Sequence, residues 1–308
     1  MKVNQGKEAL VSRFEGCMVG LVVGDALGAV VEGMSGAEIK RRYGKVNEML
    51  GSDRHGLPPG GYTDDTAMML CIARSVVGKG RFEAEDAAAK FLGWFDSGPV
   101  GIGRTTWIAL SAMKGGASWD EAGLIAHERL GGMSAGNGSI MRCAPIGLLD
   151  FRHRDRLVKD SIDSSRITHW DEKACWGAVA LNMAIAEILG GKRGNLLSKI
   201  RGRIEQPEVS RALDEVPGLN PRDIEPSAYV IDTLQAALWC FLTTTSFEQA
   251  VVTAVNLGGD TDTVGAVCGA LAGVGYGLEA VPARWKEPLR DRDEILRLAR
   301  EIYELAIK

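Results

Sequence analysis

Residues 16–28 read GCMVGLVVGDALG and residues 265–273 read GAVCGALAG, two apolar stretches in which every fourth residue is glycine. Spacing of four aligns the glycines along one face of a helix. A glycine inside a helix costs about 1 kcal/mol relative to alanine, so seven of them cost roughly 7 kcal/mol. Close packing between backbones can offset that cost. The pattern therefore predicts two central, buried and tightly packed helices; the alternative is a kinked or frayed pair.

Helical periodicity dominates the rest of the chain, and no run alternates apolar and polar residues as a half-buried strand would. Segments of helical spacing are residues 14–31, 67–77, 84–95, 105–113, 174–189, 229–242, 247–255, 264–276 and 294–307. The glycine-rich breaks between them are too short for domain linkers. We predict a single compact all-α domain over residues 1–308. A two-domain chain would need its boundary within 191–226, the most polar stretch.

The composition narrows the classes of partner. The 308 residues are 45% hydrophobic and 25% charged, as in folded proteins, and the net charge of -4 disfavours binding to nucleic acid or to an anionic membrane. Six cysteines without a C-x-x-C pair, and no secretory signal, favour a reduced cytoplasmic compartment. The longest uncharged run, residues 264–278, is too short to suggest a membrane span. We expect a cytoplasmic protein, with a monomer as the default.

Two clusters of oxygen donors stand just before apolar helical segments: YTDDT at residues 62–66 and NLGGDTDT at residues 256–263. Adjacent carboxylates repel, and a helix N-terminus or a metal ion can neutralise them. Capping by Thr63 or Asp64 would explain the first cluster alone. Two such clusters favour a binuclear metal site. Oxygen donors without His or Cys favour Mg²⁺ or Mn²⁺, and two divalent cations would balance the four carboxylates Asp64, Asp65, Asp260 and Asp262.

Weaker signals lie between these clusters. The loop GNGS at residues 136–139 can form an anion cradle from backbone N–H groups, and GIGRT at residues 101–105 is a second glycine loop. Thr168 and Asp171 resemble a capping box that places His169 near a helix start, where a simple polar contact is the alternative role for His169. Tyr229 can present its ring to a base or lie in the core.

The motifs and their order along the chain resemble those of the ADP-ribosylglycohydrolase family. The resemblance covers residues 20–28, 62–66, 136–142, 168–169, 229–239 and 258–265. The resemblance implies an all-α fold, two Mg²⁺ or Mn²⁺ ions, and hydrolysis of the glycosidic bond between ADP-ribose and a modified group. The metal ligands it implies are Thr63, Asp64, Asp65, Asp260, Asp262 and Thr263. The catalytic residues it implies are Glu32 and Asp64, either of which can take the proton of the attacking water. The substrate-binding residues it implies are Gly103, Gly136, Asn137, Gly138, Ser139, His169 and Tyr229.

One position departs from the family pattern. Gly101 stands where relatives often have aspartate, near the scissile bond in arginine-specific members. The expected substrate is therefore an ADP-ribosylated protein or small molecule, with ADP-ribose as product. Its linkage is open among arginine, serine, O-acyl and nucleic-acid-linked forms and free ADP-ribose derivatives. Two other functions stay open: a non-catalytic ADP-ribose binder or structural protein, and a helical magnesium-dependent diphosphate enzyme.

Overall fold

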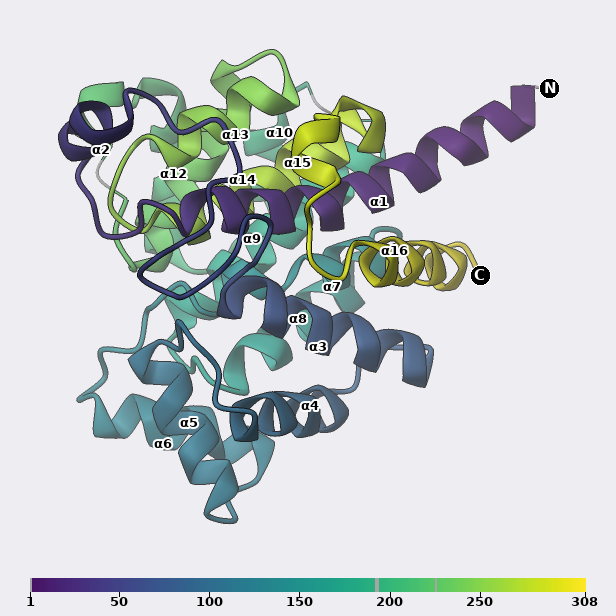
Figure 1. Ribbon diagram of the computed structural model, residues 1–308. Helices are drawn as coiled ribbons and strands as arrows, with labels where there is room; N and C mark the ends of the chain where they lie inside the picture. Colours follow the sequence, from purple (N-terminus) through teal and green to yellow (C-terminus); the bar gives the residue numbers. More distant parts are fainter. Residues whose placement is uncertain (1, 192–193, 225) are drawn as a thin grey trace.

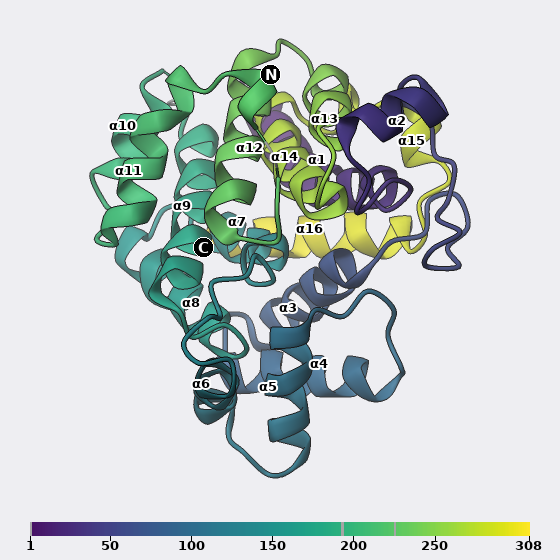
Figure 2. The same cartoon turned by 90° about the vertical axis from the view of Figure 1, so that its left-hand side faces the viewer.

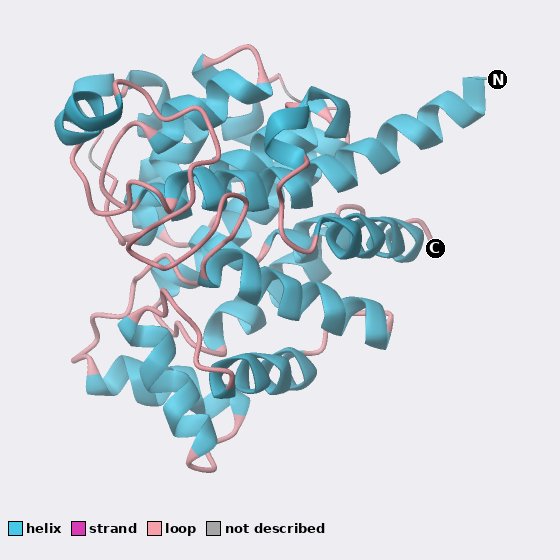
Figure 3. Ribbon diagram, in the orientation of Figure 1, coloured by secondary structure: helices cyan, strands magenta, loops and turns pink. Residues whose placement is uncertain are grey.

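The computed structural model describes residues 2–191, 194–224 and 226–308, and these residues form helices joined by loops without a β-strand (Figure 3). The predicted all-α class is confirmed. The α-helices are α1 (Lys2–Gly28), α2 (Gly36–Tyr43), α3 (Asp64–Lys79), α4 (Ala84–Asp96), α5 (Arg104–Lys114), α6 (Trp119–Arg129), α7 (Ala144–Leu149), α8 (Arg154–Arg166), α9 (Glu172–Leu189), α10 (Leu196–Arg201), α11 (Pro207–Glu215), α12 (Val230–Thr243), α13 (Phe247–Val255), α14 (Thr261–Tyr276), α15 (Ala283–Lys286) and α16 (Arg292–Ala306). Short 3₁₀ turns lie at Ile140–Arg142, Val216–Gly218, Pro221–Asp223 and Leu278–Ala280.

Helices α1 and α14 pack against each other through the two glycine rows, and the prediction of central, tightly packed helices is confirmed. A Cβ added to Gly16 would lie 2.5 Å from the carbonyl oxygen of Gly273, and the additions at Gly20 and Gly24 would lie closer still to α14 carbonyl oxygens. Helices α12 and α13 pack on α14, and α16 packs on α1 (Figures 1 and 2). The pair is therefore the buried axis of the molecule.

Several helices differ from the expected segments. Helix α1 begins at Lys2 rather than at residue 14, and it ends at Gly28 rather than at residue 31. Helices α2 and α6 were not expected, although Ser35 and Ser118 each form a capping box with the glutamate three residues later. The expected capping box of Thr168 is wrong. Helix α9 begins at Glu172 with Asp171 as its N-cap residue.

The polar stretch at residues 191–226 is part of the same body. In its described residues, α10 and α11 place Leu196, Ile200, Val209 and Leu213 in the main hydrophobic core. These helices pack on α9 and α12, so the described part of this stretch shares the core of the rest of the chain. In the described parts of the chain, each helix is too short or too polar to pass through a lipid bilayer.

The α1–α14 contact also sets the positions of two other helix starts. Where this contact ends, the Thr261 hydroxyl donates a hydrogen bond of 2.8 Å to the Gly28 carbonyl oxygen. This hydrogen bond aligns the start of α14 with the end of α1. One turn earlier on α1, the buried Asp25 reaches the start of α3. Helices α4, α5 and α6 form a lobe beside these helix starts (Figures 1 and 2).

The glycine rows predict opposite results for one substitution at two sites. Gly24→Ala should destabilise the fold by about 3 kcal/mol or more, because the new Cβ overlaps the α14 backbone, which has no room to move. Gly78→Ala in α3 meets nothing within 4 Å and should raise stability by about 0.5–1 kcal/mol. Urea unfolding of both variants measures the difference. Equal stability of the two variants would contradict close packing as the reason for the rows.

Candidate active site

Asp25 connects the central helix pair to the first acidic cluster. Its carboxylate is fully buried and accepts hydrogen bonds from the backbone N–H and the hydroxyl of both Thr63 and Thr66. The four donor–acceptor distances lie between 2.6 and 3.0 Å. This arrangement holds the first turn of α3 against α1. Asp25 was not expected as a site residue, although a lone carboxylate within a glycine row signals a buried polar role.

The two acidic clusters meet in one cavity of about 310 Å³, although nearly two hundred residues separate them in the chain. Asp64 and Asp65 reach it from the start of α3, and Asp260 and Asp262 reach it from the start of α14. Glu32, which follows α1, also lines the cavity. The spatial meeting that the metal hypothesis requires is therefore present.

Burial and mutual repulsion both disfavour the charged carboxylates here. Burial raises the pKa of Asp65 well above its usual range, and the nearby Asp25 and Asp64 carboxylates raise it further. Burial likewise raises the pKa of Asp64 and of Asp262, again with neighbouring carboxylates adding to the effect. A positive charge in the cavity would relieve this repulsion.

The clusters do not act as helix caps. Thr63 and Asp260 occupy the N-cap positions of α3 and α14, yet neither side chain accepts a capping hydrogen bond. One Asp65 carboxylate oxygen, Oδ1, is buried without any hydrogen-bond partner. An orphaned carboxylate oxygen beside three other carboxylates suits a hard cation.

The oxygen donors of the cavity suit Mg²⁺ or Mn²⁺, but they do not form a closed cage of protein ligands around an ion. Among the described residues, no three His, Cys, Asp or Glu side chains already surround a common point as ligands of one ion. Mg²⁺ in proteins usually keeps several waters and takes only one or two carboxylates, so such a cage is not required. The hydroxyl of Thr263 lies against Asp65 and supplies a further oxygen donor.

Two backbone loops line the same cavity as the carboxylates. Gly136, Asn137 and Gly138 line it, and Asn137 Nδ2 donates to Asp260 Oδ2 at 2.7 Å. The start of α5, residues 103–106, lines it as well. The N-cap position of α5 is Gly103, so unpaired N–H groups of the first helical turn are available to an anion. Of residues 103–106, only Gly103 was predicted to bind the substrate. The G-x-G-R-T pattern ahead of an apolar helix is the sequence signal that marks this helix start.

His169 is buried beside the glycine loop, and a Cβ added to Gly138 would lie 2.6 Å from its ring. Its Nδ1 is 2.8 Å from the hydroxyl of Thr168, which also accepts a hydrogen bond of 2.8 Å from Arg142 Nη2. The arginine can only donate, so the hydroxyl best satisfies both partners by donating its own proton to Nδ1. That arrangement leaves the proton of His169 on Nε2, next to the cavity wall formed by Gly136 and Gly138.

The neutral state of His169 has two physical causes. Burial lowers its pKa to about 3, and the charge of Arg142 acts in the same direction. Arg142 is itself fully buried, and burial lowers its pKa to about 10, so it stays charged at neutral pH. Its guanidinium lies 4.5 Å from the ring centre of Phe91 and donates to the Ser164 carbonyl oxygen. His169 can thus offer a hydrogen bond to a ligand without adding a charge.

Three predicted site residues do not line this cavity. The hydroxyl of Ser139 donates to the Ala174 carbonyl oxygen, 3.2 Å away, and so points towards α9. Tyr229 pairs with Gly136 through the backbone, while its own hydroxyl donates to Glu208 at 3.3 Å. Thr63 lies behind the carboxylates, bonded to Asp25. The other predicted residues, Glu32, Asp64, Asp65, Gly103, Gly136, Asn137, Gly138, His169, Asp260, Asp262 and Thr263, all line it.

A family model described as ADP-ribosylglycohydrolase matches residues 6–308. The chain belongs to the ADP-ribosylglycohydrolase family. It is 33% identical to the ADP-ribosyl-[dinitrogen reductase] glycohydrolase of Rhodospirillum rubrum, over 89% of each chain. It is 31% identical to the ADP-ribosylarginine hydrolase Tri1 of Pseudomonas putida (strain GB-1), over 97% of this chain and 80% of the relative.

The fold agrees with this assignment. A solved structure, titled ADP-ribosylglycohydrolase-related protein complex, superposes with a TM-score of 0.82 at 36% identity, covering 97% of this chain and 99% of that chain. The protein is therefore an enzyme of the hydrolase class, as the sequence resemblance implied.

The Arg142–Thr168–His169 arrangement predicts the effect of removing one hydroxyl. Thr168→Val should destabilise the protein by about 1–3 kcal/mol, because two buried polar groups lose their shared partner. Without a donor at Nδ1, the proton of the neutral His169 ring should no longer be confined to Nε2, and ¹⁵N NMR of the imidazole detects this change of tautomer. Thr168→Ser retains the hydroxyl and should retain the Nε2–H signal. A valine variant with an unchanged imidazole spectrum would refute the arrangement.

Proposed function

We propose that the protein is a metal-dependent hydrolase that cleaves the glycosidic bond between ADP-ribose and a modified acceptor. The observation that carries this proposal is the meeting of four aspartates from two helix starts in a cavity that also contains a glycine loop and a neutral histidine. A hydrolase of this family needs a place for a diphosphate, a ribose and a water. The cavity offers a chemically distinct group for each.

The metal ligands would be Asp64, Asp65, Asp260 and Asp262, with the hydroxyl of Thr263 as a further donor. Thr63 would assist through its contact with Asp25 and its position 3.4 Å from Asp65 Oδ2. When bound, Mg²⁺ or Mn²⁺ ions supply charge that orients ribose hydroxyls and makes a bound water more acidic. Asn137 holds Asp260 in place through its 2.7 Å hydrogen bond.

The water proton would pass to Glu32 rather than to Asp64. Asp64 is surrounded by carboxylates and is a proposed ligand, and a carboxylate bound to a cation is a weaker base. Glu32 stands at the side of the cavity, where its carboxylate contacts the ring of His55 and lies 3.6 Å from Arg54. These two partners fix its orientation while it faces the site.

The rest of ADP-ribose would lie along the opposite wall. Backbone N–H groups of residues 136–138 and of the first turn of α5 suit a diphosphate. The Nε2–H of His169 would donate to a ribose or phosphate oxygen. Tyr229 adjoins Gly136 and would lie at the adenosine end, outside the described lining of the cavity.

The acceptor linkage is the finer part of the proposal. Curated relatives include an ADP-ribosylarginine hydrolase, which favours arginine, while glycine in place of the aspartate at residue 101 favours another linkage. Release of ADP-ribose from arginine-, serine- and O-acetyl-linked substrates separates these linkages, because only a substrate with the matching linkage would be cleaved.

Metal dependence predicts two classes of variant. Asp64→Asn and Asp262→Asn should weaken Mg²⁺ or Mn²⁺ binding and reduce turnover by about a hundredfold or more, because each removes a proposed ligand. Glu32→Gln should reduce turnover by a similar factor while metal binding stays. Calorimetry measures the binding and chromatography the released ADP-ribose. Asp155→Asn, which changes a fully exposed carboxylate, is the matched control. Full activity in EDTA would disprove the proposal.

Gly101 allows a separate test of the carboxylate positions. Its φ is +83°, and an added Cβ would lie 2.9 Å from Asp64 Oδ1. Gly101→Ala should displace Asp64 and lower metal affinity and turnover by about tenfold or more. Gly98→Ala introduces similar backbone strain, at a φ of +71°, with nothing within 4 Å of the Cβ. If both variants lose the same activity, strain in the loop rather than contact with Asp64 is responsible.

A further inference from the structure

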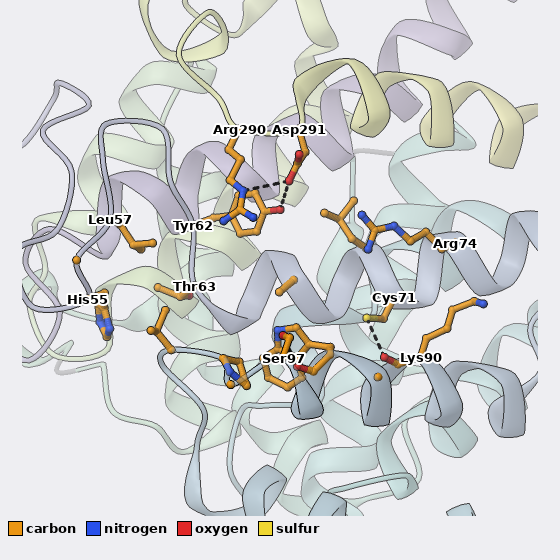
Figure 4. A pocket seen from close by; sticks show the side chains of 18 residues that line it. His55, Leu57, Tyr62, Thr63, Cys71, Arg74, Lys90, Ser97, Arg290 and Asp291 are labelled. Carbon is orange, nitrogen blue, oxygen red and sulfur yellow. Dashed lines mark hydrogen bonds and ion pairs between the residues drawn. The ribbon is translucent and has the colours of Figure 1, made fainter.

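A second and larger cavity, of about 710 Å³, lies beside the proposed active site. Figure 4 shows Tyr62, Arg290 and Asp291 on one side of this cavity and Lys90 and Ser97 on the other. We name it the side cavity. Its walls come from residues 55–57, residues 62–63, the part of α3 between residues 67 and 74, the part of α4 between residues 90 and 94, residues 97–100 and residues 290–291. Of the residues that line it, only Thr63 and His55 have a proposed role in hydrolysis.

The side cavity adjoins the carboxylate end of the active site rather than the glycine-loop end. Thr63, next to the aspartate pair, lines it, and so does His55, whose ring contacts the Glu32 carboxylate. Val100 lines it as well, and the following residue, Gly101, lines the active site. In the proposed reaction the carboxylates surround the bond that breaks, so a group leaving from that bond would reach the side cavity.

The charges of the side cavity differ in sign from those of the active site. Among the described residues that line it, three cations, Arg74, Lys90 and Arg290, accompany one carboxylate, Asp291. Asp291 is already engaged, since it accepts from the Tyr62 hydroxyl and lies 3.4 Å from Arg290. The other two cations have carboxylate partners outside the lining, which are Glu294 and Asp86.

Two of the three cations are weakly held and able to attract a ligand. The Arg290 side chain is 64% exposed and lies 3.4 Å from Asp291, and the Lys90 side chain is 35% exposed and lies 3.3 Å from Asp86, so solvent screens both ion pairs. Arg74 is held more firmly, because it donates two hydrogen bonds to Glu294. The cavity also offers apolar surface for a chain of residues, including Leu57, Trp94 and the exposed Val100. Positive charge beside apolar surface complements a polypeptide that carries carboxylates.

We infer that the side cavity binds the acceptor side of the substrate, an acidic polypeptide segment that flanks the ADP-ribosylated residue. The inference rests on the proposed function. The active site would recognise ADP-ribose itself, and the side cavity would select among acceptors by their neighbouring charge. A substrate with no polypeptide attached would not use it.

The test compares three substrates with the double variant Lys90→Ala/Arg290→Ala. The substrates are an ADP-ribosylated peptide with glutamates around the modified residue, the same peptide with lysines there, and the ADP-ribosylated free amino acid. The variant should raise KM for the acidic peptide by about threefold to tenfold, with kcat unchanged, because two attractive charges are lost. KM for the free amino acid should not change. Arg201→Ala on the distant α10 is the matched control.

Other outcomes overturn the inference. An unchanged KM for the acidic peptide means that the side cavity does not read its charge, and an equal rise for the free amino acid means that the cavity holds ADP-ribose. Binding of an unmodified, fluorescently labelled glutamate-rich peptide tests the inference without turnover. Absence of that binding contradicts it even if the free amino acid is hydrolysed. Preferential binding of a short oligonucleotide through Lys90 and Arg290 would assign the cavity to another class of acceptor.

Discussion

The contact between the backbones of α1 and α14 is the constraint on which the rest of the structure depends. Only glycine lets the carbonyl oxygens of one helix approach the backbone of the other so closely, so the two rows define both the pair and its register. A shift by one turn would misalign Gly28 with Thr261, whose hydroxyl bonds the Gly28 carbonyl oxygen. Asp260 and Asp262 flank that threonine, so packing in the core sets the position of half of the site.

The other half depends on the same helix through an electrostatic contact. Asp25 stands between two glycines of the row, and its four hydrogen bonds hold the start of α3. Burial raises the pKa of Asp25, while the hydrogen bonds from Thr66 and Thr63 act against that rise. Its carboxylate supports the aspartates of α3 mechanically and also repels them, because it raises the pKa of Asp65. A positive charge in the cavity would offset the repulsion between these carboxylates, and the same carboxylates would then bind the cation.

Sequence alone predicted the parts of this arrangement that local chemistry determines. The glycine rows, the all-α class and the two aspartate clusters follow from spacing and residue type, and the structure places the clusters together. Ser139 and Thr168 show where that reasoning stops. A hydroxyl bonds whichever buried partner the fold supplies: the Ala174 carbonyl oxygen for Ser139, and Arg142 with His169 for Thr168. Ala174 and Arg142 lie on segments distant in the chain from the hydroxyls that they bond to, so no local pattern records these two partners.

The active site combines a cluster of carboxylates with one buried cation, and the fold supplies both. Carboxylates gather where α3 and α14 begin, whereas Arg142 lies buried behind His169 on the glycine-loop side. Among the described residues no carboxylate bonds Arg142; its hydrogen bonds go to Ser164, Thr168 and Met68, and Phe91 covers its face. A diphosphate would be repelled by the aspartates and attracted by this buried cation. The same charges that disfavour each group alone would therefore orient ADP-ribose, with its diphosphate towards Arg142 and its reacting ribose towards the aspartates.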